Sequence, residues 1–138
     1  MKKIDDMRHG RHCVFLMHVH FVFVTKYRRS AFNKEVIDFL GSVFAKVCKD
    51  FESELVEFDG ESDHVHLLIN YPPKVSVSKL VNSLKGVSSR LTRQHHFKSV
   101  EASLWGKHLW SPSYFAGSCG DAPLEMIKQY IQDQETPH

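Results

Sequence analysis

The sequence has few cysteines and no long apolar run. Its three cysteines, Cys13, Cys48 and Cys119, are odd in number, far apart and outside any Cys-x-x-Cys spacing. This argues against a disulfide framework or a thiolate zinc site and favours a reducing, cytoplasmic environment. The longest apolar run, residues 13–24, is too short to span a bilayer, and no signal-peptide pattern precedes it. We therefore expect no membrane association.

Internal repeats, linkers and low-complexity stretches are also missing from the sequence. A chain of 138 residues, 42% of them hydrophobic, is long enough for one core and too short to expect two. We predict a single domain over residues 1–138.

Positive charge is missing from one segment. Residues 50–63 contain seven acidic side chains and no lysine or arginine, so all 18 basic residues lie elsewhere, beside only nine acidic ones. Such segregation favours a nucleic-acid partner on the basic side, although an acidic, solvated edge strand would also explain the acidic segment.

Hydrophobic periodicity predicts strands and helices in alternation. Residues 13–24 are typical of a central strand, and a helix capped by Asn33 follows the basic turn at residues 25–29. Two strands joined through Gly60 come next, and Ser76 can cap a second helix that runs to about His95. A short strand near residues 113–118 and a last helix, opened by Asp121 and Pro123, complete the chain.

This order predicts an α+β fold of the ferredoxin-like, split βαβ type. Its antiparallel sheet carries two helices on one face, and one helix is added at the C-terminus. The first and third strands are then central neighbours. If Val65, Leu67 and Ile69 pack under the two helices, the alternating residues point to the open face.

His64 and His66 are two such alternating residues, in the segment Asp63-His64-Val65-His66-Leu67. Two imidazoles on one face of a strand are able to chelate one cation, and divalent cations commonly handle phosphate oxygens. The tripeptide alone is weak support, because His18-Val19-His20 repeats it in this histidine-rich chain.

Tyr130 and Gln134 lie four residues apart on the predicted last helix and therefore one turn above each other. A tyrosine oxygen is able to attack a phosphodiester and hold the product covalently. An amide oxygen is able to serve as a neutral third ligand beside two histidines. An apolar stripe flanked by Tyr130, with a solvated Gln134, is the plainer explanation.

Five motifs together resemble the single-tyrosine HUH transposases of small bacterial insertion sequences (TnpA-type). The motifs occur in order over nearly the whole chain: Lys26-Tyr27-Arg28-Arg29, the His64-Val65-His66 strand, Leu84-Lys85-Gly86 with Ser88-Ser89-Arg90, Leu104-Trp105 with Leu109-Trp110, and Gln129-Tyr130-Ile131 with Gln134. The resemblance selects His64 and His66 over His18 and His20. Because a histidine in an apolar strand is more often a hydrogen-bonded core residue than a ligand, we expect at most a supporting role for His20.

The resemblance implies a site and a reaction. His64, His66 and Gln134 would bind Mg²⁺ or Mn²⁺, and Tyr130 would be the nucleophile that forms a 5′-phosphotyrosine and frees a 3′-hydroxyl. It also implies a homodimer whose tyrosine helix is able to act in trans on hairpins at single-stranded element ends. Gly117 and Gly120, before that helix, look like the joint this placement needs.

A set of basic and aromatic residues could contact single-stranded DNA through charge and base stacking. Ordinary solvated charges and core aromatics explain them comparably well. The candidates are Lys26, Tyr27, Arg28, Arg29, Lys85, Arg90 and Arg93, with Trp105 and Trp110 as further stacking residues.

Three functions compete on the sequence. The first is a metal-dependent single-strand DNA transposase acting through Tyr130. The second is a noncatalytic RNA- or DNA-binding module, and the third is a metal hydrolase that activates water at the histidine pair. A domesticated relative that processes chromosomal hairpin repeats would use the same residues as the first.

Overall fold

A four-stranded antiparallel sheet forms the centre of the computed structural model, which describes residues 8–10, 13–104, 108–118 and 124–134. The strand order is β4 (Glu54–Gly60), β5 (His64–Asn70), β3 (His18–Val24) and β6 (Phe115–Gly117). The predicted first and third strands, β3 and β5, are therefore the two central neighbours. The acidic segment of the sequence coincides largely with β4, an edge strand.

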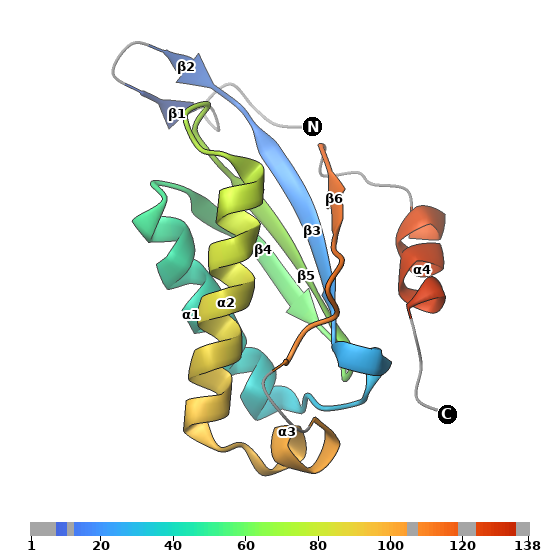
Figure 1. Ribbon diagram of the computed structural model, residues 1–138. Helices are drawn as coiled ribbons and strands as arrows, with labels where there is room; N and C mark the ends of the chain where they lie inside the picture. The colour runs from blue at the N-terminus through green and yellow to red at the C-terminus, as the bar shows by residue number, and fades with distance from the viewer. Residues whose placement is uncertain (1–7, 11–12, 105–107, 119–123, 135–138) are drawn as a thin grey trace.

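Helices cover both faces of this sheet (Figure 1). The long helices α1 (Lys34–Asp50) and α2 (Val77–His95) lie side by side on one face, and α4 (Leu124–Asp133) lies on the other. This arrangement confirms the predicted α+β fold, with two helices on one face and an added C-terminal helix. Within the described residues, no helix is both long and apolar enough to cross a membrane.

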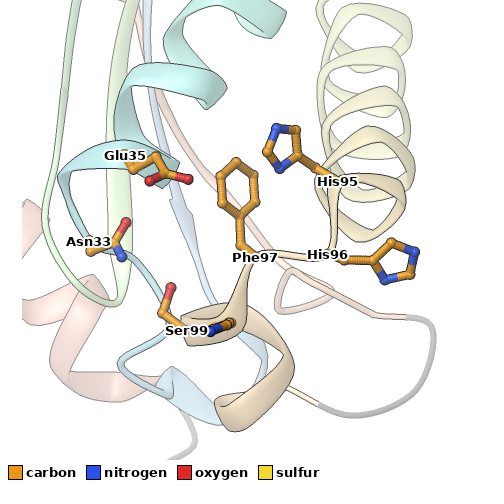
Figure 2. Close-up of a pocket in the computed structure, with 7 residues that line it drawn as sticks. Asn33, Glu35, His95, His96, Phe97 and Ser99 are labelled. Carbon is orange, nitrogen blue, oxygen red and sulfur yellow. The ribbon is translucent and has the colours of Figure 1, made fainter.

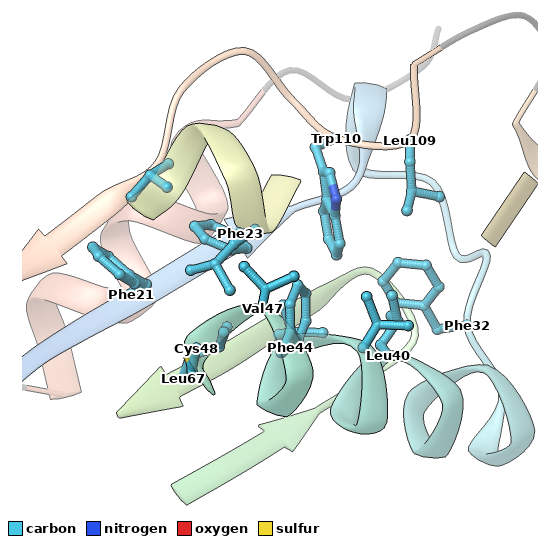
Figure 3. Packing of buried hydrophobic residues seen from close by; sticks show 14 of the residues in the cluster. Phe21, Phe23, Phe32, Leu40, Phe44, Val47, Cys48, Leu67, Leu109 and Trp110 are labelled. Carbon is cyan, nitrogen blue, oxygen red and sulfur yellow. The ribbon is translucent and has the colours of Figure 1, made fainter. Parts of the chain in front are cut away.

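The main core lies between the sheet and the pair α1 and α2 (Figure 3). Phe21 and Phe23 of β3 meet Phe44 of α1 and Trp110 there, with the Phe23 and Phe44 ring centroids 6.0 Å apart. A smaller cluster on the opposite face joins Val22 and Val24 to Ile127 of α4. The alternation of β3 therefore supplies both cores, because successive side chains point to opposite faces.

One local prediction needs correction, and two short elements were not predicted. Residues 13–24 form two strands, β2 (Val14–Phe15) and β3, and β2 pairs with β1 (Arg8–His9) in a separate hairpin. A short helix, α3 (Lys98–Ser103), follows α2 in a stretch for which no element was predicted from the sequence. The basic turn contains a 3₁₀ turn, η2 (Lys26–Arg28). Asp121 and Pro123, expected to open α4, lie outside the described residues.

Both predicted helix caps are confirmed. The Asn33 side chain accepts a hydrogen bond from the Val36 amide at 3.0 Å, and the Ser76 hydroxyl accepts one from the Lys79 amide at 3.3 Å. Each satisfies a helix N-terminal amide that has no partner within its own helix.

Replacing the first of these caps should lower stability. We expect Asn33→Ala to reduce the free energy of unfolding by about 1 kcal/mol, because the capping acceptor is lost. Asn33→Ser keeps an acceptor and should stay close to wild type, as measured by urea unfolding. Equal destabilisation by both substitutions would contradict the capping role.

Candidate active site

His64 and His66 project from β5 onto the face of the sheet that α4 covers. Val65, Leu67 and Ile69 alternate with them and are fully buried in the core under α1 and α2. The two imidazole rings have centroids 4.9 Å apart and are nearly perpendicular, and His64 is only 6% exposed. This confirms the predicted direction of the pair and brings two nitrogen ligands together.

A carboxylate fixes the orientation of His64. Its Nδ1 donates a hydrogen bond to Asp63 Oδ1 at 2.8 Å, and Asp63 Oδ2 lies 3.6 Å from Nε of Arg28 in the η2 turn. With Nδ1 protonated, Nε2 carries the lone pair that a cation would need. That Nε2 is 3.6 Å from a Glu61 carboxylate oxygen. Imidazole nitrogens with carboxylates nearby are ligand types that a divalent cation accepts.

Burial keeps His66 neutral. It lowers the pKa of His66 to about 4, helped by the neighbouring His64 and His20 rings and opposed by Asp59. A neutral imidazole keeps the lone pair that a metal ion requires. His66 is therefore ready to act as a ligand at neutral pH without first losing a proton.

The lowered pKa of His66 should make the metal-free protein sensitive to acid. Between pH 6.5 and 4 the unfolded imidazole binds a proton that the folded one does not, so stability falls as the pH drops through this window. The fall in pKa from 6.5 to about 4 corresponds to about 3 kcal/mol, which solvent screening of this partly exposed ring reduces to about 2 kcal/mol. We expect His66→Gln to remove this dependence, as measured by urea unfolding at several pH values. His9→Gln changes an exposed histidine and should leave the pH dependence of stability as in wild type. An unchanged pH profile in His66→Gln would contradict the contribution assigned to His66.

A cavity of about 480 Å³ lies beside the histidine pair. Its walls come from the end of β4, from β5 and from α4, and its lining combines two carboxylates with the two imidazoles: Asp59, Glu61, His64, His66, Ile127, Lys128, Ile131 and Gln132. Carboxylates next to imidazole nitrogens favour a bound cation. In the part of the chain that the structure describes, no group of three or more His, Cys, Asp or Glu residues is arranged as a metal site.

Tyr130 and Gln134 lie together, but not at this cavity. The Tyr130 hydroxyl is 2.8 Å from Ser113 Oγ, and Gln134 Oε1 accepts hydrogen bonds from Ser111 Oγ at 3.0 Å and Ser113 Oγ at 3.2 Å. Burial raises the pKa of Tyr130, and the Ser113 hydrogen bond opposes that shift. The structure thus pairs the predicted nucleophile with the predicted amide ligand, while other α4 residues line the cavity beside the histidines of the same chain.

The second histidine tripeptide lies on the adjacent strand and on the same face. His20 has its ring centroid 5.6 Å from that of His66, whereas the Asn70 amide donates to His18 Nε2 at 3.4 Å. Burial lowers the pKa of His20, and its Nδ1 is buried without a hydrogen-bond partner. His20 therefore contacts the predicted pair from the side, and His18 is held by β5.

The predicted DNA-binding residues are spread over several parts of the fold. Lys26 lies over the Tyr27 ring at 5.2 Å in the η2 turn, and Tyr27 is 42% exposed. Arg28 bonds Asp63 and lies 3.5 Å from two carbonyl oxygens near the end of α4. Arg29 follows it in the chain.

The α2 candidates differ from one another. Lys85 donates to the Ser111 and Ser113 carbonyls at 2.7 and 3.1 Å, and burial lowers its pKa to about 8. Arg90 lines a groove between α1 and α2, and Arg93 has a buried Nε without a partner.

The predicted stacking role of Trp110 needs correction. Trp110 is 5% exposed, and its indole N–H donates to the buried Ser88 hydroxyl at 2.9 Å, so it is a core residue. Trp105 lies outside the described residues.

A separate cavity of about 380 Å³ lies where α1 begins and α2 ends (Figure 2). The His95 ring stacks on Phe97 at 4.0 Å, and the His96 Nδ1 donates to Glu101 at 2.8 Å. The cavity belongs to the α1 and α2 side of the molecule, whereas the histidine pair faces α4. Its lining is Asn33, Glu35, His95, His96, Phe97, Lys98 and Ser99.

Three residues at the site were not assigned a role from the sequence. Asp63 directly precedes His64 in the sequence. An acidic residue at that position could have predicted a hydrogen-bond partner that orients the imidazole. Ser111 and Ser113 gave no such signal, because serines beside a proline are typical of any loop. Only the tertiary contacts connect them to Tyr130 and Gln134.

Comparison with known proteins places the chain in a family. The IS200-like transposase family model matches residues 13–134. The chain is 30% identical over 129 residues to the ISDra2 transposase TnpA of Deinococcus radiodurans, covering 94% of this chain and 91% of that protein. It is 34% identical over 115 residues to the transposase for insertion sequence element IS200 of Salmonella typhimurium, covering 83% and 74%.

Solved structures show the same likeness. A crystal structure of a Deinococcus radiodurans protein assigned as a transposase superposes with a TM-score of 0.83 at 32% identity, covering 95% of this chain and all of the other. A REP-associated tyrosine transposase bound to a REP hairpin shares the fold, with a TM-score of 0.57 at 14% identity over 92% and 69% of the two chains. The chain therefore belongs to the IS200-like transposases, enzymes that cut DNA and transfer its strands.

Proposed function

We propose that this transposase cleaves and rejoins single-stranded DNA ends through Tyr130, at a phosphate held by a divalent cation. The observation that carries the proposal is the histidine pair on the face covered by the Tyr130 helix, with His64 already oriented by Asp63. A noncatalytic binding module would have no need for two imidazoles oriented in this way.

His64 and His66 would hold Mg²⁺ or Mn²⁺ together with the Gln134 amide oxygen. When bound, the cation would polarise the scissile phosphate. Both imidazoles offer lone pairs, since Asp63 fixes the His64 tautomer and burial keeps His66 neutral. Asp59 and Glu61 add negative charge beside them.

Tyr130 would then attack the phosphorus through its phenolic oxygen. The new bond joins that oxygen to phosphorus, the bond from phosphorus to the 3′ oxygen breaks, and the DNA leaves as a free 3′-hydroxyl with a 5′-phosphotyrosine on the protein. The tyrosine proton passes to solvent and the leaving oxygen takes up a proton. Because the phosphodiester energy is conserved in the covalent bond, a second 3′-hydroxyl is able to reverse the step and rejoin strands.

The position of Tyr130 supports action between two copies of the chain. Ile127, Lys128, Ile131 and Gln132 face the cavity beside the histidines, whereas Tyr130 and Gln134 bond the serines. In a homodimer, the tyrosine and glutamine of one protomer would complete the histidine pair of its partner.

Hairpin DNA is the proposed substrate. A structural neighbour with the same fold was solved bound to a REP hairpin, which supports hairpin recognition in this architecture. The exposed Tyr27 and its neighbour Lys26 are the best placed of the predicted contacts for stacking and charge. Arg29, Arg90 and Arg93 are proposed to add backbone contacts.

A test for a covalent protein–DNA adduct distinguishes the competing functions. The protein is incubated with Mn²⁺ and labelled single strands that carry hairpins from the ends of insertion sequences, then run on a denaturing gel. A labelled protein band is expected. Cleavage without such a band would favour a metal hydrolase, and hairpin binding without cleavage would favour a binding module. Chromosomal hairpin repeats as substrates would test the domesticated role.

A further inference from the structure

The segment from Trp110 to Ser113 is fixed rigidly to the centre of the fold. The Trp110 indole bonds the buried Ser88, and the Ser111 amide donates to the Val24 carbonyl at 2.7 Å. The Lys85 ammonium holds the carbonyls of both Ser111 and Ser113. Pro112 between them restricts the backbone further.

Two hydroxyl groups of this segment converge on α4. Ser113 Oγ lies within hydrogen-bond distance of both Tyr130 Oη and Gln134 Oε1, and Ser111 Oγ also donates to Gln134 Oε1. A serine hydroxyl has only one proton, and an amide oxygen only accepts. When Ser113 donates to Gln134, the Tyr130 hydroxyl must therefore donate to Ser113.

Other contacts leave Tyr130 and Gln134 little freedom. The Tyr130 ring packs 6.0 Å from the Phe115 ring of β6, and Gln134 Nε2 donates to the Tyr130 carbonyl at 3.0 Å. The phenolic oxygen and the amide oxygen are thus held on the same serine hydroxyl. Because the two serines occupy both lone pairs of the amide oxygen, binding a cation would replace one of these hydrogen bonds and leave the other in place. A nucleophile and a ligand that serve one phosphate need such a fixed mutual geometry, because small misplacements slow the chemical step.

We propose that Ser111 and Ser113 are positioning residues that hold Tyr130 and Gln134 as one preorganised pair, with Lys85 fixing the segment that carries them. The inference rests on the proposed function, since it assumes that Tyr130 attacks and Gln134 binds the cation. It gives Lys85 a role inside the fold in place of the DNA contact predicted from the sequence.

The test measures the rate constant of adduct formation in single turnover at saturating hairpin DNA. Ser113→Ala should lower this rate about tenfold to a hundredfold and leave the hairpin dissociation constant unchanged. Ser113→Thr keeps the hydroxyl and should stay within about threefold of wild type. Ser42→Ala, which removes an exposed hydroxyl bonded only within α1, is the matched control and should react like wild type.

A double-mutant cycle distinguishes positioning from general support of α4. If Ser113 acts by holding Gln134, then Ser113→Ala should have a much smaller effect in a Gln134→Ala background, because coupled residues are not additive. Full additivity, or a rate for Ser113→Ala equal to or above that of wild type, would overturn the inference. Lys85→Met should slow adduct formation without weakening hairpin binding. Weaker hairpin binding with an unchanged rate would show that Lys85 contacts DNA and does not position the serine segment.

The failure of this inference is distinguishable from failure of the proposed function. If the wild-type protein forms no adduct, the proposed function fails and the positioning pair fails with it. If the wild type forms the adduct and Ser113→Ala does so equally fast, only the positioning role is wrong.

Discussion

Tyr130→Phe is expected to abolish the covalent adduct with hairpin DNA and to lower strand cleavage by more than about a thousandfold. The substitution removes a single oxygen atom. Phenylalanine retains the ring that packs against Phe115 and against the small cluster around Ile127. The fold and the position of α4 should therefore persist. The measurement is the denaturant-resistant band with labelled DNA and Mn²⁺.

A matched tyrosine controls for loss of any phenol. Tyr71 directly follows β5 and packs against the main core, and Tyr71→Phe should form the adduct at the wild-type rate. Binding of the hairpin by Tyr130→Phe should remain, since the proposed DNA contacts are elsewhere. Cleavage at the wild-type rate in Tyr130→Phe would show that water or another side chain attacks, and would remove Tyr130 from the mechanism.

His64→Ala and His66→Ala should each reduce cleavage roughly a hundredfold or more, because each removes one of two nitrogen ligands from the proposed cation site. The loss should appear as a requirement for much higher Mn²⁺ concentration. Hairpin binding without metal should remain close to wild type. Titration of cleavage rate against Mn²⁺, alongside a binding assay in EDTA, separates the two effects.

The chain supplies its own control for these variants in the second tripeptide. His18→Ala and His20→Ala change the same residue type on the adjacent strand and the same face, and should lower cleavage by less than about fivefold. His20 is the more sensitive of the two, because its ring lies beside His66. If the variants at 18 and 20 lose cleavage while those at 64 and 66 retain it, the cation has been assigned to the wrong pair.

Much of the site was predictable because strand and helix periodicities fix which side chains share a face. The alternation around Val65 and Leu67 placed His64 and His66 opposite the core, and the four-residue spacing placed Tyr130 beside Gln134. The caps at Asn33 and Ser76 followed from local chemistry alone. These inferences needed no information about distant parts of the chain.

The remaining features depend on contacts between residues far apart in sequence. Ser111 and Ser113 approach α4 only because Lys85 and Val24 anchor their backbone, and no local pattern encodes that. The apolar run at residues 13–24 looked like one strand, yet Val14 pairs with His9 in a hairpin of its own. Trp110 fits a stacking motif as well as a core position, and only burial decides between them.

The pairing of β3 with β5 sets His64 opposite Val24 and His66 opposite Val22. Because side chains alternate along a strand, a slip of β5 by one residue would turn both histidines into the apolar interior and Val65 and Leu67 outward. The burial of Val65, Leu67 and Ile69 on the opposite face of the sheet therefore fixes the strand register that orients the two histidines. Among natural relatives that have lost activity, we expect some that retain both histidines and the tyrosine and carry substitutions only at the buried positions of β5.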